Sequence, residues 1–229
     1  MTDAVASQKR AAAFAAADLV ESGMRLGLGT GSTFAFVIER LAERVRTEGL
    51  QLLGVPTSIA TARLAEAAGI PIVELDAVDR LDLAIDGADE VDPAKSLIKG
   101  GGGAHLRERI VAAAARELVV IVDEGKLVDV LGRGFRLPVE VVPLGWTHTA
   151  RRVGKTGGEP ARRERDGEPV VTDNGNWLLD CHYPSGIADP AALARELDST
   201  VGVVDHGLFV GMTGRILVGQ PGGAVRTIA

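Results

Sequence analysis

The chain has 229 residues, of which 46% are hydrophobic and 24% are charged, with 25 basic and 31 acidic side chains. This composition is typical of a globular protein of one or two domains and excludes a disordered chain. The formal net charge of −6 and the aromatic content of 3% argue against a nucleic-acid partner, because nucleic-acid surfaces use basic side chains and stacking rings.

The N-terminus and the single cysteine indicate the compartment. No apolar run reaches the roughly 18 residues that a membrane-spanning helix needs, so no membrane partner is expected. Lys9-Arg10 followed by Ala11–Ala17 mimics a signal peptide, but the run is mostly alanine and is interrupted by Asp18, which favours an amphipathic first helix. Cys181 has no partner for an internal disulfide, as in a reducing compartment. We expect a cytoplasmic protein.

From the N-terminus to about residue 121, apolar strand-like runs alternate with helical stretches. Helices are predicted from the glycine loop after residue 28 to about Arg46, and from Thr57-Ser58 to Gly69. Unbroken β-branched runs suit strands covered on both faces, and their alternation with helices indicates βαβ units in a parallel sheet. The predicted strands are Met24–Leu28, Leu50–Val55, Ile70–Leu75, Leu81–Ile85 and Leu118–Val122.

The pattern changes after about Leu131. The later segments predict, in order, a strand, a helix, two strands, a helix and a strand, which is the ferredoxin-like β-α-β-β-α-β arrangement. Asp173–Asn176 has the composition of a hairpin turn, and Asp189 is a candidate N-cap. A final hairpin is predicted from Arg215–Val218 and Val225–Ile228. The six segments are Leu137–Val142, Thr147–Val153, Val170–Thr172, Trp177–Cys181, Pro190–Leu197 and Val201–Val204.

Polar residues gather where the first strands end, and open α/β sheets bind ligands beyond the carboxyl ends of their strands. The loop Gly29–Thr33 enters a helix, where free N–H groups and the helix dipole suit a phosphate, and Thr30, Ser32 and Thr33 add hydroxyls. It is neither a dinucleotide fingerprint, whose third glycine is Ser32 here, nor a P-loop. Taken alone, the loop is either a phosphate cradle or a tight turn.

Two further loops carry charged groups. Asp86 and Asp89 are three residues apart, so one turn either places both carboxylates in one cleft or caps the next helix. Four consecutive glycines, Gly100–Gly103, follow Lys99 and suit a backbone that passes close to a small ligand. Glu108, in the first turns of the next helix, either points back toward the loop or is a surface glutamate favoured by the helix dipole.

These groups, together with Lys126 after the strand at residues 118–122, suit proton transfer on a small phosphorylated anion. Carboxylates move protons, and cations stabilise an oxyanion. The four histidines have no zinc-ligand spacing, and neither a Gly-x-Ser-x-Gly elbow nor a cofactor motif occurs. We therefore expect no metal and no cofactor, and neither hydride transfer nor nucleophilic catalysis.

In this order and spacing, the motifs resemble the type A ribose-5-phosphate isomerase family. Each motif alone is weak, but together they cover essentially the whole chain. The resemblance rests on Gly29–Thr33, Asp86–Glu90, Lys99–Gly102 with Glu108, Leu137–Val141, Val171–Asn176 and His206–Phe209.

The resemblance implies a metal-free and cofactor-free aldose-ketose isomerase of the non-oxidative pentose phosphate pathway. Its substrates would be D-ribose 5-phosphate and D-ribulose 5-phosphate, interconverted through a cis-enediolate. Glu108 matches the catalytic base of the family, and Asp86 matches the group for ring opening and hydroxyl proton transfer. Asp89 and Lys99 match the groups that hold the enediolate oxygens. By the same match, the substrate-binding residues are Thr30, Gly31, Ser32, Thr33, Asp86, Gly87, Ala88, Asp89, Lys99, Gly100, Gly101, Gly102 and Lys126.

The family fold implies an α/β protein with a Rossmann-like parallel-sheet domain and a smaller ferredoxin-like α+β domain, in agreement with the elements above. We expect the catalytic domain at residues 1–131 and 205–229 and the small domain at residues 132–204, assembled as a homodimer or homotetramer. Two positions depart from the family. Gly103 stands where alanine is usual and is expected to loosen the loop, and Glu124-Gly125 stands where small or polar residues are common.

Two alternatives stay open. A related sugar-phosphate isomerase or amino-sugar-phosphate deaminase would use a similar carboxylate, and the turnover of several sugar phosphates would separate them. A non-catalytic sugar-phosphate sensor would bind its ligand without turning it over. The complete set of acid and base groups and the lack of a preceding helix-turn-helix argue against the sensor.

Overall fold

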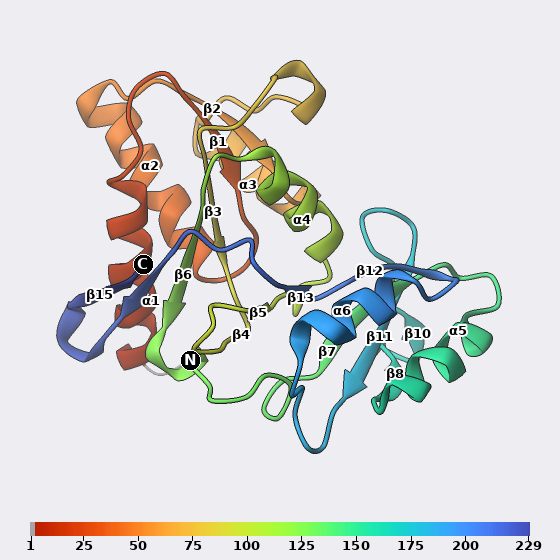
Figure 1. Ribbon diagram of the computed structural model, residues 1–229. Helices are drawn as coiled ribbons and strands as arrows, with labels where there is room; N and C mark the ends of the chain where they lie inside the picture. The colour runs from red at the N-terminus through yellow and green to blue at the C-terminus, as the bar shows by residue number, and fades with distance from the viewer. Residues whose placement is uncertain (1–2) are drawn as a thin grey trace. The chain divides into compact units, whose positions relative to one another are not determined.

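The computed structural model describes residues 3–229, which form two compact units (Figure 1). The first unit contains the chain up to Ala88, Arg107–Lys126 and Met212–Ala229. The second contains Asp89–Leu106 and Leu127–Gly211. The chain therefore leaves the first unit twice and returns to it twice.

A six-stranded sheet forms the centre of the first unit, in the order β15-β14-β6-β3-β1-β2. The strands from β14 to β2 run parallel, and β15 pairs antiparallel with β14 at the edge. The final hairpin predicted from the sequence is confirmed, and it joins this sheet beside β6. Every residue of β6 is buried, as expected for a central parallel strand covered on both faces. The strands are β1 (Met24–Leu28), β2 (Leu52–Pro56), β3 (Leu83–Gly87), β6 (Leu118–Asp123), β14 (Arg215–Gly219) and β15 (Val225–Ile228).

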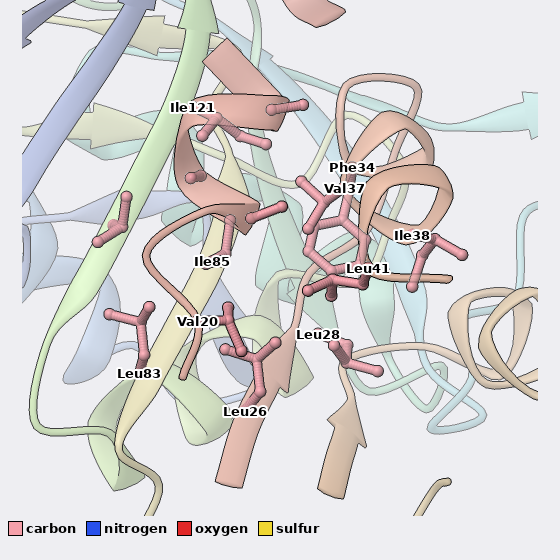
Figure 2. Packing of buried hydrophobic residues seen from close by; sticks show 14 of the residues in the cluster. Val20, Leu26, Leu28, Phe34, Val37, Ile38, Leu41, Leu83, Ile85 and Ile121 are labelled. Carbon is pink, nitrogen blue, oxygen red and sulfur yellow. The ribbon is translucent and has the colours of Figure 1, made fainter. Parts of the chain in front are cut away.

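Helices α1 and α2 pack on one another, and an apolar cluster joins them to the sheet (Figure 2). Leu28 of β1 and Ile85 of β3 belong to the same buried cluster as Phe34 and Leu41 of α2. Full burial of each such side chain stabilises the fold by about 1.5–3 kcal/mol. The helical segments with residues in this unit are α1 (Asp3–Ala17), α2 (Phe34–Glu48), α3 (Ile59–Ala67), η1 (Leu75–Ala77), α4 (His105–Ala114), η2 (Glu124–Lys126) and η4 (Pro221–Gly223).

The opposite face of β1 lies against α4, and a glycine permits the close approach. A Cβ on Gly27 would be 2.6 Å from Cγ1 of Val111 in α4 and 2.9 Å from Cβ of Ala84 in β3. Both distances are shorter than van der Waals contact, so a larger residue would push α4 away from the sheet. Gly27 thus sets the position of α4, the helix that carries Glu108.

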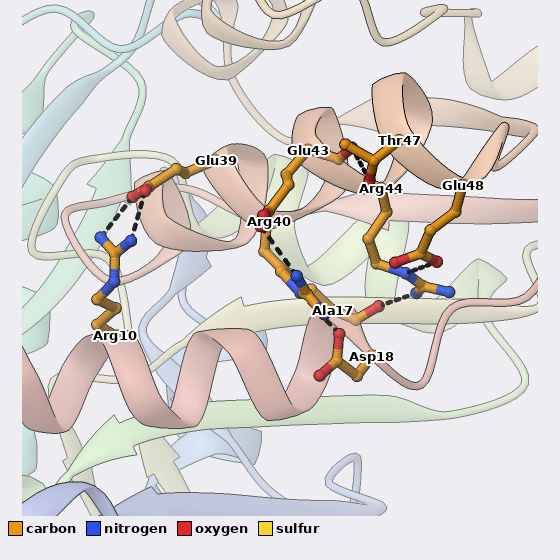
Figure 3. Close-up of polar contacts among 9 residues, drawn as sticks. All are labelled: Arg10, Ala17, Asp18, Glu39, Arg40, Glu43, Arg44, Thr47 and Glu48. Carbon is orange, nitrogen blue, oxygen red and sulfur yellow. Dashed lines mark hydrogen bonds and ion pairs between the residues drawn. The ribbon is translucent and has the colours of Figure 1, made fainter.

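Charged side chains tie α1 to α2 (Figure 3). Arg10 makes a bidentate pair with Glu39, with N···O distances of 2.6 and 2.8 Å, and Arg40 donates to Asp18 at 2.9 Å. Arg44 donates to the carbonyl oxygen of Ala17 at 2.8 Å. Exposed pairs contribute only about 0.2–1 kcal/mol each, so their main effect is on the orientation of α1.

The second unit contains a four-stranded antiparallel sheet in the order β12-β7-β11-β8. Helix α5 connects β7 to β8, and α6 connects β11 to β12, so the β-α-β-β-α-β order is as predicted, but β8 takes the place of the predicted strand Val170–Thr172. Asp189 caps α6 as predicted, because its side chain accepts the N–H of Ala192 at 2.9 Å. Within residues 3–229, no helix is both long and apolar enough to cross a membrane. The elements are β7 (Leu137–Val141), α5 (Trp146–Val153), η3 (Gly154–Thr156), β8 (Glu159–Arg162), β11 (Trp177–His182), α6 (Pro190–Asp198) and β12 (Val203–His206).

Two predicted strands are wrong. The segment Ile70–Leu75 makes a single parallel bridge, between Ile72 and Gly54 of β2, because Pro71 has no N–H to donate to a ladder. Val170–Thr172 likewise makes only the antiparallel bridge between Val171 and Trp177. Its expected partner, β11, pairs with β7 and β8 instead. A separate short hairpin precedes it, formed by β9 (Glu164–Arg165) and β10 (Glu168–Pro169).

The unit boundaries differ from the division expected at residues 131/132 and 204/205. Residues 89–106, 127–131 and 205–211 belong to the second unit. A small three-stranded antiparallel sheet joins residues 89–106 to residues 205–211, and Leu127 makes a single parallel bridge with Val91. Its strands are β4 (Glu90–Val91), β5 (Leu97–Ile98) and β13 (Leu208–Phe209).

One ion pair in the first unit makes its stability depend on pH. Glu117, before β6, accepts two hydrogen bonds of 2.6 Å from Arg215 of β14, and these bonds lower the pKa of the Glu117 carboxyl below its ordinary value of 4.5. A lowered folded-state pKa contributes stability above the unfolded pKa, and this is lost as the pH falls through the folded value. We expect Glu117→Gln to reduce the free energy of unfolding at pH 7 by at most about 1 kcal/mol, since the pair is partly exposed. Urea unfolding at several pH values should show the difference shrinking below pH 4.5; a difference independent of pH would contradict this account.

Candidate active site

The strand order of the first unit marks one place for a ligand. From β1 the chain winds to β2 on one side and then to β3 on the other, so the winding reverses between β1 and β3. Open α/β sheets bind ligands at such a point, beyond the carboxyl ends of the strands. The loop Gly29–Thr33 follows β1, and Asp86 lies at the end of β3. Two of the predicted motifs therefore meet at this position.

A buried carboxylate holds the glycine loop there. Asp86 is 3% exposed, and its Oδ1 accepts the N–H of Thr30 at 3.0 Å and the N–H of Gly87 at 2.7 Å. Gly29 passes so close that a Cβ at this position would overlap the Asp86 carboxylate. The loop and Asp86 thus fix each other, which a loop serving only as a tight turn would not require.

A cluster of hydroxyls supports the loop from β2 and α3. Oγ1 of Thr30 is 2.8 Å from Oγ1 of Thr57, 2.9 Å from Oγ of Ser58 and 3.1 Å from Oγ1 of Thr61. Thr61 also donates to the carbonyl oxygen of Gly29 at 2.8 Å. The motifs of the sequence did not predict this cluster. Three hydroxyl residues within five positions after a neighbouring strand could have indicated it.

Two lysines come from elements that contact one another. Lys9 of α1 donates from Nζ to Oγ of Ser32 at 3.1 Å, and so brings a cation to the loop. Its neighbour Gln8 accepts the N–H of Glu124 at 3.2 Å, where η2 begins, and η2 ends at Lys126. Sequence reasoning had no means to find Lys9, because a lysine in an amphipathic helix is ordinary.

Glu108 is a buried residue of the first turn of α4, with 6% of its surface exposed. The alternative of an exposed surface glutamate is therefore wrong. Because α4 packs closely on β1 through Val111, the carboxylate is carried by a rigid element.

The second unit holds Asp89 and the loop Lys99–Gly103. Lys99 is 3% exposed; its N–H donates to the carbonyl oxygen of Gly207 at 2.9 Å, and its Nζ lies 5.4 Å from the ring centre of Phe209. Oδ2 of Asp89 accepts the N–H of Gly101 at 2.8 Å. This unit therefore holds Asp89 against the glycine loop that follows the buried Lys99.

Three positions of this loop favour glycine because a side chain would clash there or because φ is positive. Gly100 has φ of +95°, and a Cβ there would be 2.6 Å from Nδ1 of His105. A Cβ on Gly101 would be 2.8 Å from Oδ1 of Asp89. Gly103 has φ of +80° and donates its N–H to the carbonyl oxygen of Gly100 at 2.9 Å. Gly103 thus closes a turn, and its effect on the mobility of the loop stays a prediction.

Cys181 and His206 are both buried, and each is surrounded by groups of the fold. Burial, with a smaller effect of Asp180, raises the pKa of the Cys181 thiol to about 12, so it is not a nucleophile near neutral pH. His206 is buried between Asp198, 3.1 Å from its Nε2, and the N–H of Leu208, which donates to its Nδ1 at 3.2 Å. Residues 3–229 contain no group of three or more His, Cys, Asp and Glu residues that could hold a metal ion.

Comparison with known proteins agrees with these features. The sequence profile of ribose 5-phosphate isomerase A (phosphoriboisomerase A) matches residues 53–223. The ribose-5-phosphate isomerase A of Thermosynechococcus vestitus is 52% identical over 222 residues, which cover 95% of this chain and 93% of that protein. The chain belongs to the ribose 5-phosphate isomerase A family.

Solved structures of the family have the same fold. The ribose 5-phosphate isomerase A of Methanocaldococcus jannaschii matches with a TM-score of 0.91 and 43% identity, covering 96% of this chain and 97% of that one. A D-ribose-5-phosphate isomerase in complex with phospho-erythronic acid matches with a TM-score of 0.94 and 38% identity, covering 100% and 99%. The α/β fold class expected from the sequence is thereby confirmed.

The close approach of Gly29 to Asp86 predicts that a side chain at position 29 destabilises the protein. We expect Gly29→Ala to lower the free energy of unfolding by about 1–3 kcal/mol, because a Cβ there must displace the buried carboxylate. Gly87→Ala is the matched control, since Gly87 also flanks Asp86 but a Cβ there would lie 3.8 Å from its nearest neighbour, the carbonyl oxygen of Ile121. Denaturant unfolding of both variants decides the point, and equal losses would contradict the steric account.

Proposed function

We propose that this chain is an aldose-ketose isomerase that interconverts D-ribose 5-phosphate and D-ribulose 5-phosphate in the non-oxidative pentose phosphate pathway. The observation that carries the proposal is the full-length match to an isomerase in complex with phospho-erythronic acid. That ligand is a phosphorylated sugar acid, and its carboxylate places two oxygens on one planar group, as a cis-enediolate does on two adjacent carbons. The geometry of Asp86 and of the loop before α2 supports the same substrate class.

In the proposed reaction Glu108 takes the proton from C2 of the open-chain aldose and returns it to C1. General base catalysis of this kind typically contributes about 10²–10⁴-fold. Asp86 serves ring opening and moves the hydroxyl proton, while Asp89 and Lys99 hold the oxygens of the enediolate. A well-placed donor to such an oxyanion contributes roughly 3–4 kcal/mol, which is why a buried lysine suits the step.

The phosphate is a handle that positions the sugar without reacting. We assign it to the N–H groups and hydroxyls of Gly31, Ser32 and Thr33 and to Lys126, with Lys9 as an added cation beside Ser32. Thr30 anchors the loop in this proposal, since its N–H and its hydroxyl are both bonded within the protein. These local cations work against the net charge of −6, which repels the substrate at long range.

The remaining substrate contacts are assigned to Gly87, Ala88, Gly100, Gly101 and Gly102, and no metal or cofactor takes part. We also propose a cytoplasmic homodimer or homotetramer.

The test is isomerisation of ribose 5-phosphate by the purified, EDTA-treated chain, followed by NMR. We expect turnover without added metal, and a loss of about 10²–10⁴-fold in kcat for Glu108→Gln, which keeps the shape of the side chain and deletes the base. Exchange of the C2 proton with solvent deuterium should fall in parallel. The exposed Glu66→Gln variant on α3 is the matched control and should keep its activity.

Each other outcome points to a different conclusion. Near-normal turnover by Glu108→Gln would overturn the assignment of the base. Binding of ribose 5-phosphate without turnover by the unmodified chain would favour the sensor, and faster turnover of another sugar phosphate would favour a related isomerase or deaminase.

The two lysines should act on binding more than on chemistry. We expect Lys126→Ala and Lys9→Ala each to raise KM by roughly tenfold with a smaller change in kcat, because a charge-assisted contact contributes about 1.5–3 kcal/mol in favourable cases. Lys155→Ala, an exposed lysine of the second unit, is the control. Steady-state kinetics over a range of salt concentrations measures both effects, and a loss confined to kcat would rule out a ground-state phosphate contact.

A further inference from the structure

An arginine outside every predicted motif contacts the glycine loop of the second unit. Arg163, between β8 and β9, donates from Nη1 to the carbonyl oxygen of Gly101 at 2.9 Å and to that of Gly100 at 3.4 Å. The other edge of its guanidinium pairs with Asp180 of β11, at 2.9 Å for Nε–Oδ2 and 2.5 Å for Nη2–Oδ1. The Arg163 side chain is only 18% exposed. One rigid planar group therefore joins the four-stranded sheet to the loop.

The pairing with Asp180 decides how well Arg163 can hold the loop. A bidentate arginine–carboxylate pair fixes the plane of the guanidinium, which a lysine at the same position would not allow. The loop needs such support, because glycines have wide backbone freedom and no side chains to pack. Asp180 thus orients Arg163, and Arg163 orients the loop.

Because a peptide group is planar, fixing its C=O group also fixes the direction of its N–H group. In a trans peptide the C=O and N–H groups point in opposite directions, and the described chain has no cis peptide. With the carbonyls of Gly100 and Gly101 on Arg163, the N–H groups of Gly101 and Gly102 point away from it. The N–H of Gly101 does so and donates to Asp89 at 2.8 Å.

We propose that Arg163 is a positioning residue for the isomerase reaction, which orients the N–H groups of Gly101 and Gly102 and, through Gly101, the carboxylate of Asp89. It acts through the loop and does not contact the substrate. The inference rests on the proposed function, because Gly101 and Gly102 are among the residues proposed to contact the sugar.

The neighbouring Arg162 provides a matched control for a purely structural role. Arg162 also makes an ion pair, with Nη2 2.6 Å from Oε1 of Glu164, and its guanidinium lies over the rings of Trp146 and Trp177. No contact joins it to the glycine loop among the interactions described for residues 3–229. Arg163→Gln and Arg162→Gln therefore each remove one guanidinium and one ion pair, at neighbouring positions of the chain.

Kinetics separates positioning from stability. We expect Arg163→Gln to lower kcat by roughly 10–100-fold, since small misplacements of reacting groups cost up to about 10²-fold, while Arg162→Gln stays within about twofold. The inhibition constant of phospho-erythronic acid should rise in Arg163→Gln, whereas that of inorganic phosphate should not change. Arg163→Lys should recover part of kcat, and adding Asp180→Asn to Arg163→Gln should cost little more, because Asp180 acts through Arg163.

Amide exchange tests the inference without relying on turnover. In Arg163→Gln the N–H of Gly101 should exchange with solvent at least tenfold faster than in the unmodified chain, and in Arg162→Gln it should not. If the unmodified chain does not isomerise ribose 5-phosphate, the proposed function fails. The exchange at Gly101 still tests whether Arg163 orients the glycine loop. Unchanged exchange at Gly101, or equal losses of kcat in the two glutamine variants at matched stability, would overturn the role of Arg163.

Discussion

The hydrogen bonds from the Thr30 and Gly87 amides to one oxygen of Asp86 are the constraint on which the geometry of the loop Gly29–Thr33 depends. They require β1 and β3 to pair in parallel with Leu28 opposite Ile85, since this register brings Gly29, directly after β1, level with Asp86 in β3. Gly29 then donates its N–H to the carbonyl of Ile85 at 3.0 Å, and its missing side chain leaves room for the carboxylate. A shift of one residue would turn Asp86 to the other face of the sheet.

Each unit contains a glycine loop that is held against an aspartate carboxylate. Glycines let the backbone approach a carboxylate closely, Gly29 at Asp86 and Gly101 at Asp89. Their conformational freedom is a cost, of roughly 0.5–1 kcal/mol per residue relative to alanine in regular structure. Polar anchors from elsewhere in the chain offset it, the hydroxyl cluster around Thr30 in one unit and Arg163 in the other.

The sequence predicted what local patterns determine and missed what distant pairing determines. β6 and the loop after β1 follow from a buried apolar run and from glycines beside hydroxyls. Ile70–Leu75 has the composition of a strand, but Pro71 cannot complete a ladder, and pairing decides whether a strand forms. Lys9 meets Ser32 across 23 residues and Arg163 meets Gly101 across 62, and no periodicity connects positions so far apart.

The distribution of charge explains why those distant contacts matter for an anionic substrate. Asp86 and Glu108, the groups proposed to act as acid and base, are buried in a chain with a net charge of −6, and their negative charge would repel a sugar phosphate. In the proposed function, oriented amides at the start of α2 and lysines from α1 and η2 supply the local positive potential that offsets this repulsion. Amides and cations that lie close to an anion keep most of their effect, because salt screens mainly over longer distances. Under the proposed function, the nonlocal contacts of α1 therefore serve substrate binding as well as the fold.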